Sequence, residues 1–291
     1  MAARAKFDVV IGTDGSASGR AAVDAAARFP WPARAGALLV VASRGVIEWS
    51  PTARALAQGA AQRVGSRALR ALRRRWPAIQ VRYPLQAPSA ALLAAARSAR
   101  GAIVVGSGGR GMLGRLLLGS VSRQVVQAAP CPVLVVKGRL TRARRFTIGV
   151  DGSANSRRAA EVVARLSVPP GGQVTLVSVI EPMRVPSGGL MPARIGGTLR
   201  AEAARLTAGR RRQLEKAQRL LRIRLRRAGW KVREVIRIAT PLAGLLDAAS
   251  ASRTDVLVIG ARGTGGVARL LLGSVAEGAM IRAPLSILVV R

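Results

Sequence analysis

A spaced set of glycines that occurs twice constrains this chain more than any other feature. The frame is two glycines three positions apart, nine further residues and then a Gly-Ser pair. It occurs at Gly106, Gly109 and Gly119-Ser120, and again at Gly260, Gly263 and Gly273-Ser274. In both places a short apolar run precedes the frame and a helical pattern follows it. Free backbone N–H groups and the positive end of a helix dipole meet at such a junction, so each stretch predicts a phosphate-binding loop.

The apolar segments of the first half predict five strands that alternate with four helices. Most strand segments are continuous apolar runs, which indicates strands covered on both faces and therefore a parallel sheet. The expected strands are 7–11, 37–41, 79–83, 102–105 and 133–136, and the expected helices are 21–29, 56–76, 90–99 and one ending at 129. The second helix is expected to bury a face that recurs every four residues, formed by Leu56, Ala60, Val64, Ala68, Leu72 and Trp76.

The same order of elements begins again after a short polar linker at 139–145. Asp151-Gly152-Ser153 repeats Asp14-Gly15-Ser16 at an offset of 137, whereas the glycine frames are 154 residues apart. An insertion of about 15 residues therefore lies between the second strand and the second helix of the repeat, where a surface loop is expected at 181–197. The prediction is an α/β fold of two tandem, five-stranded, doubly wound domains with parallel sheets, at 1–139 and 144–291.

Composition excludes several kinds of chemistry. The chain has one cysteine, Cys131, and no histidine, so no disulfide within the chain and no Ser-His-Asp or Cys-His catalytic site is available. Zinc would lack its usual ligands. Cys131 stands between two prolines at the start of a strand and is expected to be a packing residue.

The net charge of +35 is divided evenly along the chain. Residues 1–141 carry 21 basic and 4 acidic side chains, and the remainder carries 27 and 9. An even division favours a solvated, arginine-rich surface, and the aromatic content of 3% argues against stacking on single-stranded nucleic acid. A surface that binds nucleic acid or another polyanion stays the alternative. No apolar run reaches the ~18 residues that a membrane span requires, and a cytoplasmic protein is expected.

Two common nucleotide motifs fit poorly. Residues 106–111 match the dinucleotide fingerprint G-x-G-x-x-G, but the second copy does not keep it, and no acidic residue follows about 20 positions later. The P-loop sequence G-x-x-x-x-G-K-[ST] is absent from the chain. What both copies keep is the longer frame that ends in Gly-Ser.

That longer frame resembles the universal stress protein family. The resemblance rests on Gly106–Val136, including Leu116–Ser122 and Cys131–Val136, and on Val150–Ser153, and it covers both halves. It implies domains of the adenine nucleotide alpha-hydrolase-like type with strand order 3-2-1-4-5. It also implies bound ATP, with Mg²⁺ as an optional companion, and pairing of the two domains through their fifth strands, 133–136 and 285–290. A homodimer is left open.

The resemblance also implies which residues would hold the nucleotide. Phosphates and ribose would be held by Gly106, Gly109, Gly119, Ser120, Val121 and Ser122. Apart from the resemblance, the sequence itself offers Arg110 as a further phosphate contact. Asp14, which follows Gly12 at the end of the first strand, would lie near the ribose, the phosphates or a metal, and the Val41 backbone would face adenine. The matching positions of the second copy are Asp151, Val179, Gly260, Gly263, Gly273, Ser274 and Val275. Ala276 replaces Ser122 there, and the lost donor should weaken phosphate binding by roughly 0.5–1.5 kcal/mol.

These residues also have structural interpretations. The glycines would allow close packing of helix on strand, Asp14 and Asp151 would cap the following turn, and the arginines would face solvent. The favoured function is an ATP-binding stress-response module rather than a dedicated catalyst, because the chain has no histidine and no paired carboxylates. Slow ATP hydrolysis stays compatible with that function. The alternatives are an interaction protein that binds no nucleotide and a protein associated with anions or nucleic acid.

Overall fold

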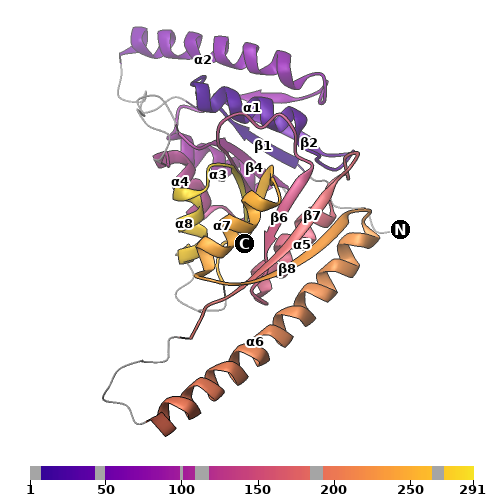
Figure 1. Ribbon diagram of the computed structural model, residues 1–291. Coiled ribbons are helices and arrows are strands. Elements are labelled where there is room, and N and C mark those ends of the chain that lie inside the picture. Colours follow the sequence, from indigo (N-terminus) through magenta and orange to yellow (C-terminus); the bar gives the residue numbers. More distant parts are fainter. Residues whose placement is uncertain (1–7, 43–49, 99–100, 109–117, 184–192, 264–271) are drawn as a thin grey trace.

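The computed structural model describes residues 8–42, 50–98, 101–108, 118–183, 193–263 and 272–291. Its strands form one ten-stranded sheet with helices on both faces (Figure 1). The first repeat contains β1 Asp8–Gly12, α1 Ala17–Arg28, β2 Gly36–Val40, α2 Pro51–Leu72, β3 Gln80–Arg82, α3 Pro88–Ser98, β4 Ala102–Gly106, α4 Ser120–Ala128 and β5 Val133–Val136. The second contains β6 Arg145–Gly149, α5 Ala154–Ala164, β7 Gln173–Ile180, α6 Ala193–Arg227, β8 Lys231–Ile238, α7 Pro241–Ala251, β9 Val256–Gly260, α8 Ser274–Arg282 and β10 Ser286–Val290.

The sheet consists of two units of order 3-2-1-4-5 joined at their fifth strands. Its full order is β3-β2-β1-β4-β5-β10-β9-β6-β7-β8. The strands pair in parallel within each repeat, and β5 pairs antiparallel with β10, where Leu134 lies opposite Leu288. The predicted fold class and the predicted pairing of the fifth strands are therefore confirmed. The pairing also covers two apolar strand edges that would otherwise be exposed.

The helices form two layers. Buried side chains of α1, α2, α5 and α6 share one core with one face of the sheet, and those of α3, α4, α7 and α8 share another with the opposite face. The first core is continuous between the repeats, because the rings of Phe29 and Phe146 meet edge to face with centroids 5.9 Å apart. Trp230 lies edge to face on Phe146 in turn, at 5.2 Å. Such aromatic contacts add stability beyond the apolar area that they bury.

The predicted buried face of α2 is only partly correct. Ala68 and Leu72 are buried, but Leu56 is 71% exposed. The physical reason is the helical period of 3.6 residues, because a row of residues spaced by four rotates by about 40° at each step. From Leu72 back to Leu56 the row has turned by about 160°, which brings Leu56 to the solvent side.

The insertion in the second repeat lengthens regular structure as well as a loop. Helix α6 has 35 residues, against 22 in α2, and it begins at Ala193, so residues 193–197 of the predicted loop are helical. Residues 184–192 of that loop lie outside the described part of the chain. Strands β7 and β8 have 8 residues each, whereas β2 and β3 have 5 and 3. In Figure 1 the first turns of α6 project beyond the sheet.

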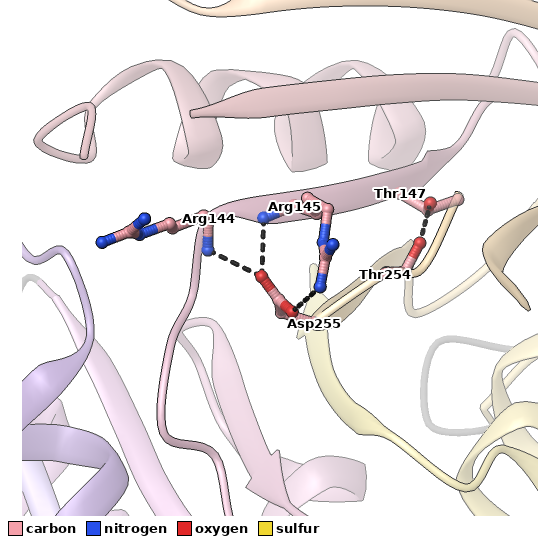
Figure 2. Close-up of polar contacts among 5 residues, drawn as sticks. All are labelled: Arg144, Arg145, Thr147, Thr254 and Asp255. Carbon is pink, nitrogen blue, oxygen red and sulfur yellow. Dashed lines mark hydrogen bonds and ion pairs between the residues drawn. The ribbon is translucent and has the colours of Figure 1, made fainter. Parts of the chain in front are cut away.

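An aspartate fastens the linker to the second repeat at the amino end of β6 (Figure 2). Oδ2 of Asp255 accepts the backbone N–H groups of Arg144 and Arg145, each at 2.9 Å, and Oδ1 pairs with the Arg145 guanidinium at 3.1 Å. Beside it the hydroxyls of Thr147 and Thr254 share a hydrogen bond of 2.5 Å. The sequence gave no signal for this cluster, since the first repeat has Gly101 where the second has Asp255.

No helix in the described ranges is long and apolar enough to cross a bilayer.

Candidate nucleotide site

The turn after β1 is built by side chains that bind its own backbone. Oδ1 of Asp14 accepts the N–H and the hydroxyl of Ser16, at 3.0 and 2.6 Å, and the Ser16 hydroxyl accepts the N–H of Gly19 at the start of α1. Gly15 has φ +76°, which glycine adopts without strain. Asp14 therefore stabilises the turn, as its structural interpretation predicted, and both of these bonds use the same carboxylate oxygen.

The second repeat builds the same turn with the same residues. Oδ1 of Asp151 accepts the N–H of Ser153 at 2.9 Å, and the Ser153 hydroxyl caps α5 through the N–H of Ser156. A Cβ added to Gly263 would lie 2.6 Å from Oδ2 of Asp151. The fold therefore brings Asp151 and Gly263 of the predicted second site into contact.

The first glycine of each frame permits close packing between layers. A side chain on Gly106 would overlap the Ser18 hydroxyl and would lie 2.5 Å from the Ser18 carbonyl oxygen. At Gly260 a Cβ would lie 2.8 Å from that of Asn155. A packing role for these two glycines is thus supported directly.

Ser18 and Asn155 also connect the two halves of each site. The Ser18 hydroxyl accepts the N–H of Gly108 at 3.0 Å, and Nδ2 of Asn155 donates to the carbonyl of Arg262 at 3.2 Å. Each bond ties the first turn of a helix, α1 or α5, to the loop that follows β4 or β9. Sequence analysis missed both residues, although they stand at the same offset of 137 as Asp14 and Asp151.

The Gly-Ser pair of each frame opens a helix without a side-chain cap. Gly119 and Gly273 are the extended N-cap residues of α4 and α8, and neither helix has a side-chain capping bond. Their own N–H groups donate back to the carbonyls of Ser107 and Ala261, at 2.7 and 2.8 Å. The loop is thereby closed against the helix, and the glycine at the N-cap has no side chain of its own that could bind the N–H groups of the first turn. This geometry suits an anion.

Ser122, which the resemblance implied as a nucleotide contact, binds its own loop in this structure. Its side chain is buried, and its hydroxyl donates to the carbonyl of Gly119 at 2.9 Å. The replacement by Ala276 in the second repeat therefore removes a bond that holds the loop. Val121 and Val275 are partly buried and pack on the core beneath α4 and α8.

At the carboxyl end of β2, one of the backbone groups that could contact adenine already has a partner. The N–H of Val41 donates to the carbonyl of Arg82 at 3.0 Å, and its side chain is buried. A Cβ at Gly12 would lie 2.9 Å from both terminal methyl carbons of Leu92, so that glycine also permits packing. Gly109 and Arg110 lie outside the described residues.

The counterpart of Val41 in the second repeat is Ser178, which corrects the match to Val179. The strand registers show this. In the first repeat Asp8 pairs with Gly36, and in the second Arg145 pairs with Gln173. Both positions are shifted by 137 residues, which places Ser178 in the second repeat where Val41 stands in the first. The Ser178 hydroxyl donates to the carbonyl of Val150 at 2.7 Å.

A buried glutamine, Gln218, also binds groups around Ser178, the counterpart of Val41 in the second repeat. Nε2 of Gln218 on α6 lies 2.9 Å from the Ser178 hydroxyl and donates to the carbonyl of Val235 at 3.0 Å. Strand β7 also continues its pairing with β8 through Ile180. Backbone groups that could contact a ligand after β2 in the first repeat are therefore partly engaged in hydrogen bonds at the equivalent place, after Val177, in the second repeat. Gln218 carries no motif that sequence analysis detects.

The described residues contain no group of three or more His, Cys, Asp or Glu side chains that would hold a metal by themselves. Of the predicted site residues that the structure describes, Asp14 and Asp151 are the carboxylates that could bind a divalent cation, together with oxygens of its ligand and water.

Comparisons with known proteins agree with this geometry. The sequence profile of the Universal stress protein family matches residues 8–137 and 142–291. A universal stress protein from Mycolicibacterium smegmatis is 30% identical over 224 residues, which are 73% of this chain and 69% of that protein. One from Mycobacterium tuberculosis is 28% identical over 201 residues, 65% of this chain and 61% of the relative. The crystal structure of a universal stress protein from Archaeoglobus fulgidus has a TM-score of 0.66 at 19% identity and covers 98% of this chain and 96% of its own.

The fold and the twice-matched profile define a tandem of two universal stress protein domains. The chain belongs to the universal stress protein family. The resemblance inferred from the glycine frame is thereby confirmed.

Proposed function

We propose that this protein is a nucleotide-dependent regulatory module that binds ATP in the first repeat. The observation that carries the proposal is the α4 junction. Gly119 opens the helix with no capping side chain, and the loop from β4 is held beside it by Ser18. Backbone N–H groups and the helix dipole are the donors that phosphates require, and the family resemblance supplies adenosine as the remainder of the ligand.

The second repeat is proposed as the weaker site. Its α8 junction has the same geometry as that of α4, but Ser178 and Gln218 occupy its counterpart of the Val41 position. Ala276 also lacks the bond by which Ser122 holds the first loop. In this proposal the chain divides into units 1–139 and 144–291, of which the first carries the nucleotide and the second supports it through β10. A cytoplasmic location stays a prediction.

Asp14 and Arg110 are assigned to the nucleotide as proposals. ATP bound at this edge would gain phosphate stabilisation from backbone donors, while Asp14 would hold ribose hydroxyls or the cation. The residues described support binding and orientation of a nucleotide rather than proton transfer, so slow hydrolysis is the most that we expect.

The test is calorimetric titration of the whole chain with Mg-ATP, using two matched variants. Gly119→Val places a branched side chain beside Gly108, whose Cα would lie 3.3 Å from the new Cβ. Gly273→Val makes the same change beside Arg262, also at 3.3 Å. We expect the first variant to abolish the tight binding phase and the second to retain it. An unchanged titration in both variants, with both folded by circular dichroism, would contradict the assignment.

A second substitution separates charge from turn formation. Asp14→Asn keeps an oxygen that accepts the Ser16 N–H but loses the carboxylate charge. If Asp14 binds the cation or ribose, affinity for Mg-ATP falls at least about tenfold while the melting temperature changes little. Unchanged affinity would restrict Asp14 to the turn.

A further inference from the structure

The charge that is divided evenly along the sequence is divided unevenly in space. Helices α1, α2, α5 and α6 have 80 residues, of which 20 are basic and 4 acidic. Helices α3, α4, α7 and α8 have 40 residues, of which 3 are basic and 2 acidic. Per residue, the first layer is thus about three times as rich in cations. A bias in overall composition alone would enrich both layers, so the position of the charge needs its own explanation.

Two helices at equivalent places in the repeats concentrate this charge in rows. On α2, Arg63, Arg67 and Arg70 are all exposed and lie within an arc of about 60°. On α6, the exposed Arg212, Arg219 and Arg226 recur every seven residues and rotate by only about 20° at each step. We call these two sets the α2 row and the α6 row.

The rows are not neutralised within the described part of the protein. Helix α2 contains no acidic residue, and no ion pair is formed by either row among the described residues. Neighbouring arginines at i,i+3 and i,i+4 repel one another and weaken the helix that carries them. A polyanion on this layer would relieve that repulsion.

The α2 and α6 rows lie on one layer but far apart. Helix α2 lies towards one end of the molecule and α6 towards the other, as Figure 1 shows. Seven strand steps separate β2 from β7, which is about 30 Å at the usual strand spacing. One ligand that contacts both rows must therefore be extended and carry repeated negative charges.

The side chains of this layer favour a duplex over other extended polyanions. Single strands are bound by stacking on exposed aromatic rings, whereas Phe29, Trp31, Trp76, Phe146 and Trp230 are all buried. A bilayer surface needs large apolar side chains to insert. Among the described residues, α1 and α5, which lie between the rows, expose none, although α2 exposes Leu56 and α6 exposes Leu206, Leu220 and Ile223 among others. Arginine forks bind phosphate oxygens in pairs, and a duplex presents such phosphates along a straight rod.

We propose that the layer formed by α1, α2, α5 and α6 is a docking surface for double-stranded nucleic acid, with the α2 and α6 rows binding its phosphate backbones. We expect the binding to be independent of base sequence, because contacts to phosphates carry no sequence information. It is a function separate from the nucleotide site at the α4 junction.

The test is fluorescence anisotropy with a labelled duplex of about 30 base pairs at about 50 and 200 mM salt. Two triple variants remove equal charge from opposite sides. One is Arg63→Gln, Arg67→Gln and Arg70→Gln, on the α2 row. The control is Arg97→Gln, Arg237→Gln and Arg282→Gln, three exposed arginines on α3, β8 and α8. Circular dichroism checks that each remains folded.

We expect the α2 variant to bind at least about tenfold more weakly at low salt, and its dependence of log affinity on log salt to flatten by up to about 2.7. The control should change affinity less than about threefold, because it alters only the long-range field. Equal weakening by both variants would overturn the proposal, as would absence of binding by the wild type at low salt. Binding to vesicles with anionic phospholipid but not to the duplex would overturn it in favour of a membrane surface.

Discussion

The contacts of Asp255, which fastens the linker, allow the change in the free energy of unfolding on its removal to be predicted. Asp255→Ala removes the acceptor of two backbone N–H groups and the partner of Arg145. The N–H of Arg144 is exposed, so water replaces most of that bond, whereas the N–H of Arg145 is partly buried and loses more. With the Arg145 side chain 43% exposed, its ion pair contributes less than about 1 kcal/mol. Together these contacts predict a loss of about 2–3 kcal/mol in the free energy of unfolding.

The assay is urea unfolding followed by far-ultraviolet circular dichroism, with two comparison variants. Asp255→Asn keeps one oxygen for the backbone but loses the charge, and should lose about 1 kcal/mol. Asp247→Ala changes an exposed aspartate on α7 and should stay within about 0.5 kcal/mol of the wild type. If Asp255→Ala is no less stable than Asp247→Ala, Asp255 does not fasten β6 in the way described.

Three further predictions concern single residues. Burial lowers the pKa of Lys137 to about 8, and its ammonium group donates to the carbonyl of Ala283. Between about pH 8 and 10 the unfolded chain therefore binds more protons than the folded one, so the stability of the wild type should rise with pH relative to Lys137→Met; a parallel pair of curves would contradict this. Burial raises the pKa of Cys131 to about 11, so the native thiol should react with a disulfide reagent at pH 8 about a hundredfold more slowly than the unfolded chain, and equal rates would refute its packing role. Gly106→Ala should destabilise the protein by at least about 2 kcal/mol in urea unfolding, because its Cβ meets the Ser18 backbone. Gly59→Ala, at a half-buried position of α2 where the new Cβ meets only the end of the Arg63 side chain at 3.7 Å, should stabilise it by about 0.5–1 kcal/mol.

The internal repeat made the fold predictable from sequence. Apolar segments in each half, most of them continuous runs, predicted parallel strands, and the glycine frame indicated the family that orders them 3-2-1-4-5. The junction of β5 with β10 followed because each unit leaves one apolar edge to be covered. All of these are properties of local sequence patterns, which repeat faithfully between the halves.

What escaped prediction depends on contacts between segments far apart in sequence. Gln218 is a helix residue whose partners lie on β7 and β8, and Asp255 binds backbone groups 110 and 111 residues away. The start of α6 was missed because the segment before it is rich in glycine and proline, which favours a loop locally. Leu56 was misplaced because spacing by four residues only approximates the helical period.

The candidate site was only partly accessible to sequence reasoning. The frame located both helix junctions, but it did not reveal that Ser122 holds its own loop or that Gly106 and Gly260 are required for packing. Nor did it show that the two sites differ at Ser178, because the offset counted from sequence placed Val179 there. Such differences lie in the register of strands, which the glycine pattern does not encode.

The central claim is that the α4 junction of the first repeat holds ATP. Native mass spectrometry of gently purified whole chains tests it most directly, since it counts nucleotides per protein. We predict one ATP on the wild type in the presence of Mg-ATP, one on Gly273→Val and none on Gly119→Val. Retention of ATP by Gly119→Val together with its loss from Gly273→Val would place the nucleotide in the second repeat, and absence of ATP from all three at millimolar nucleotide would contradict the claim.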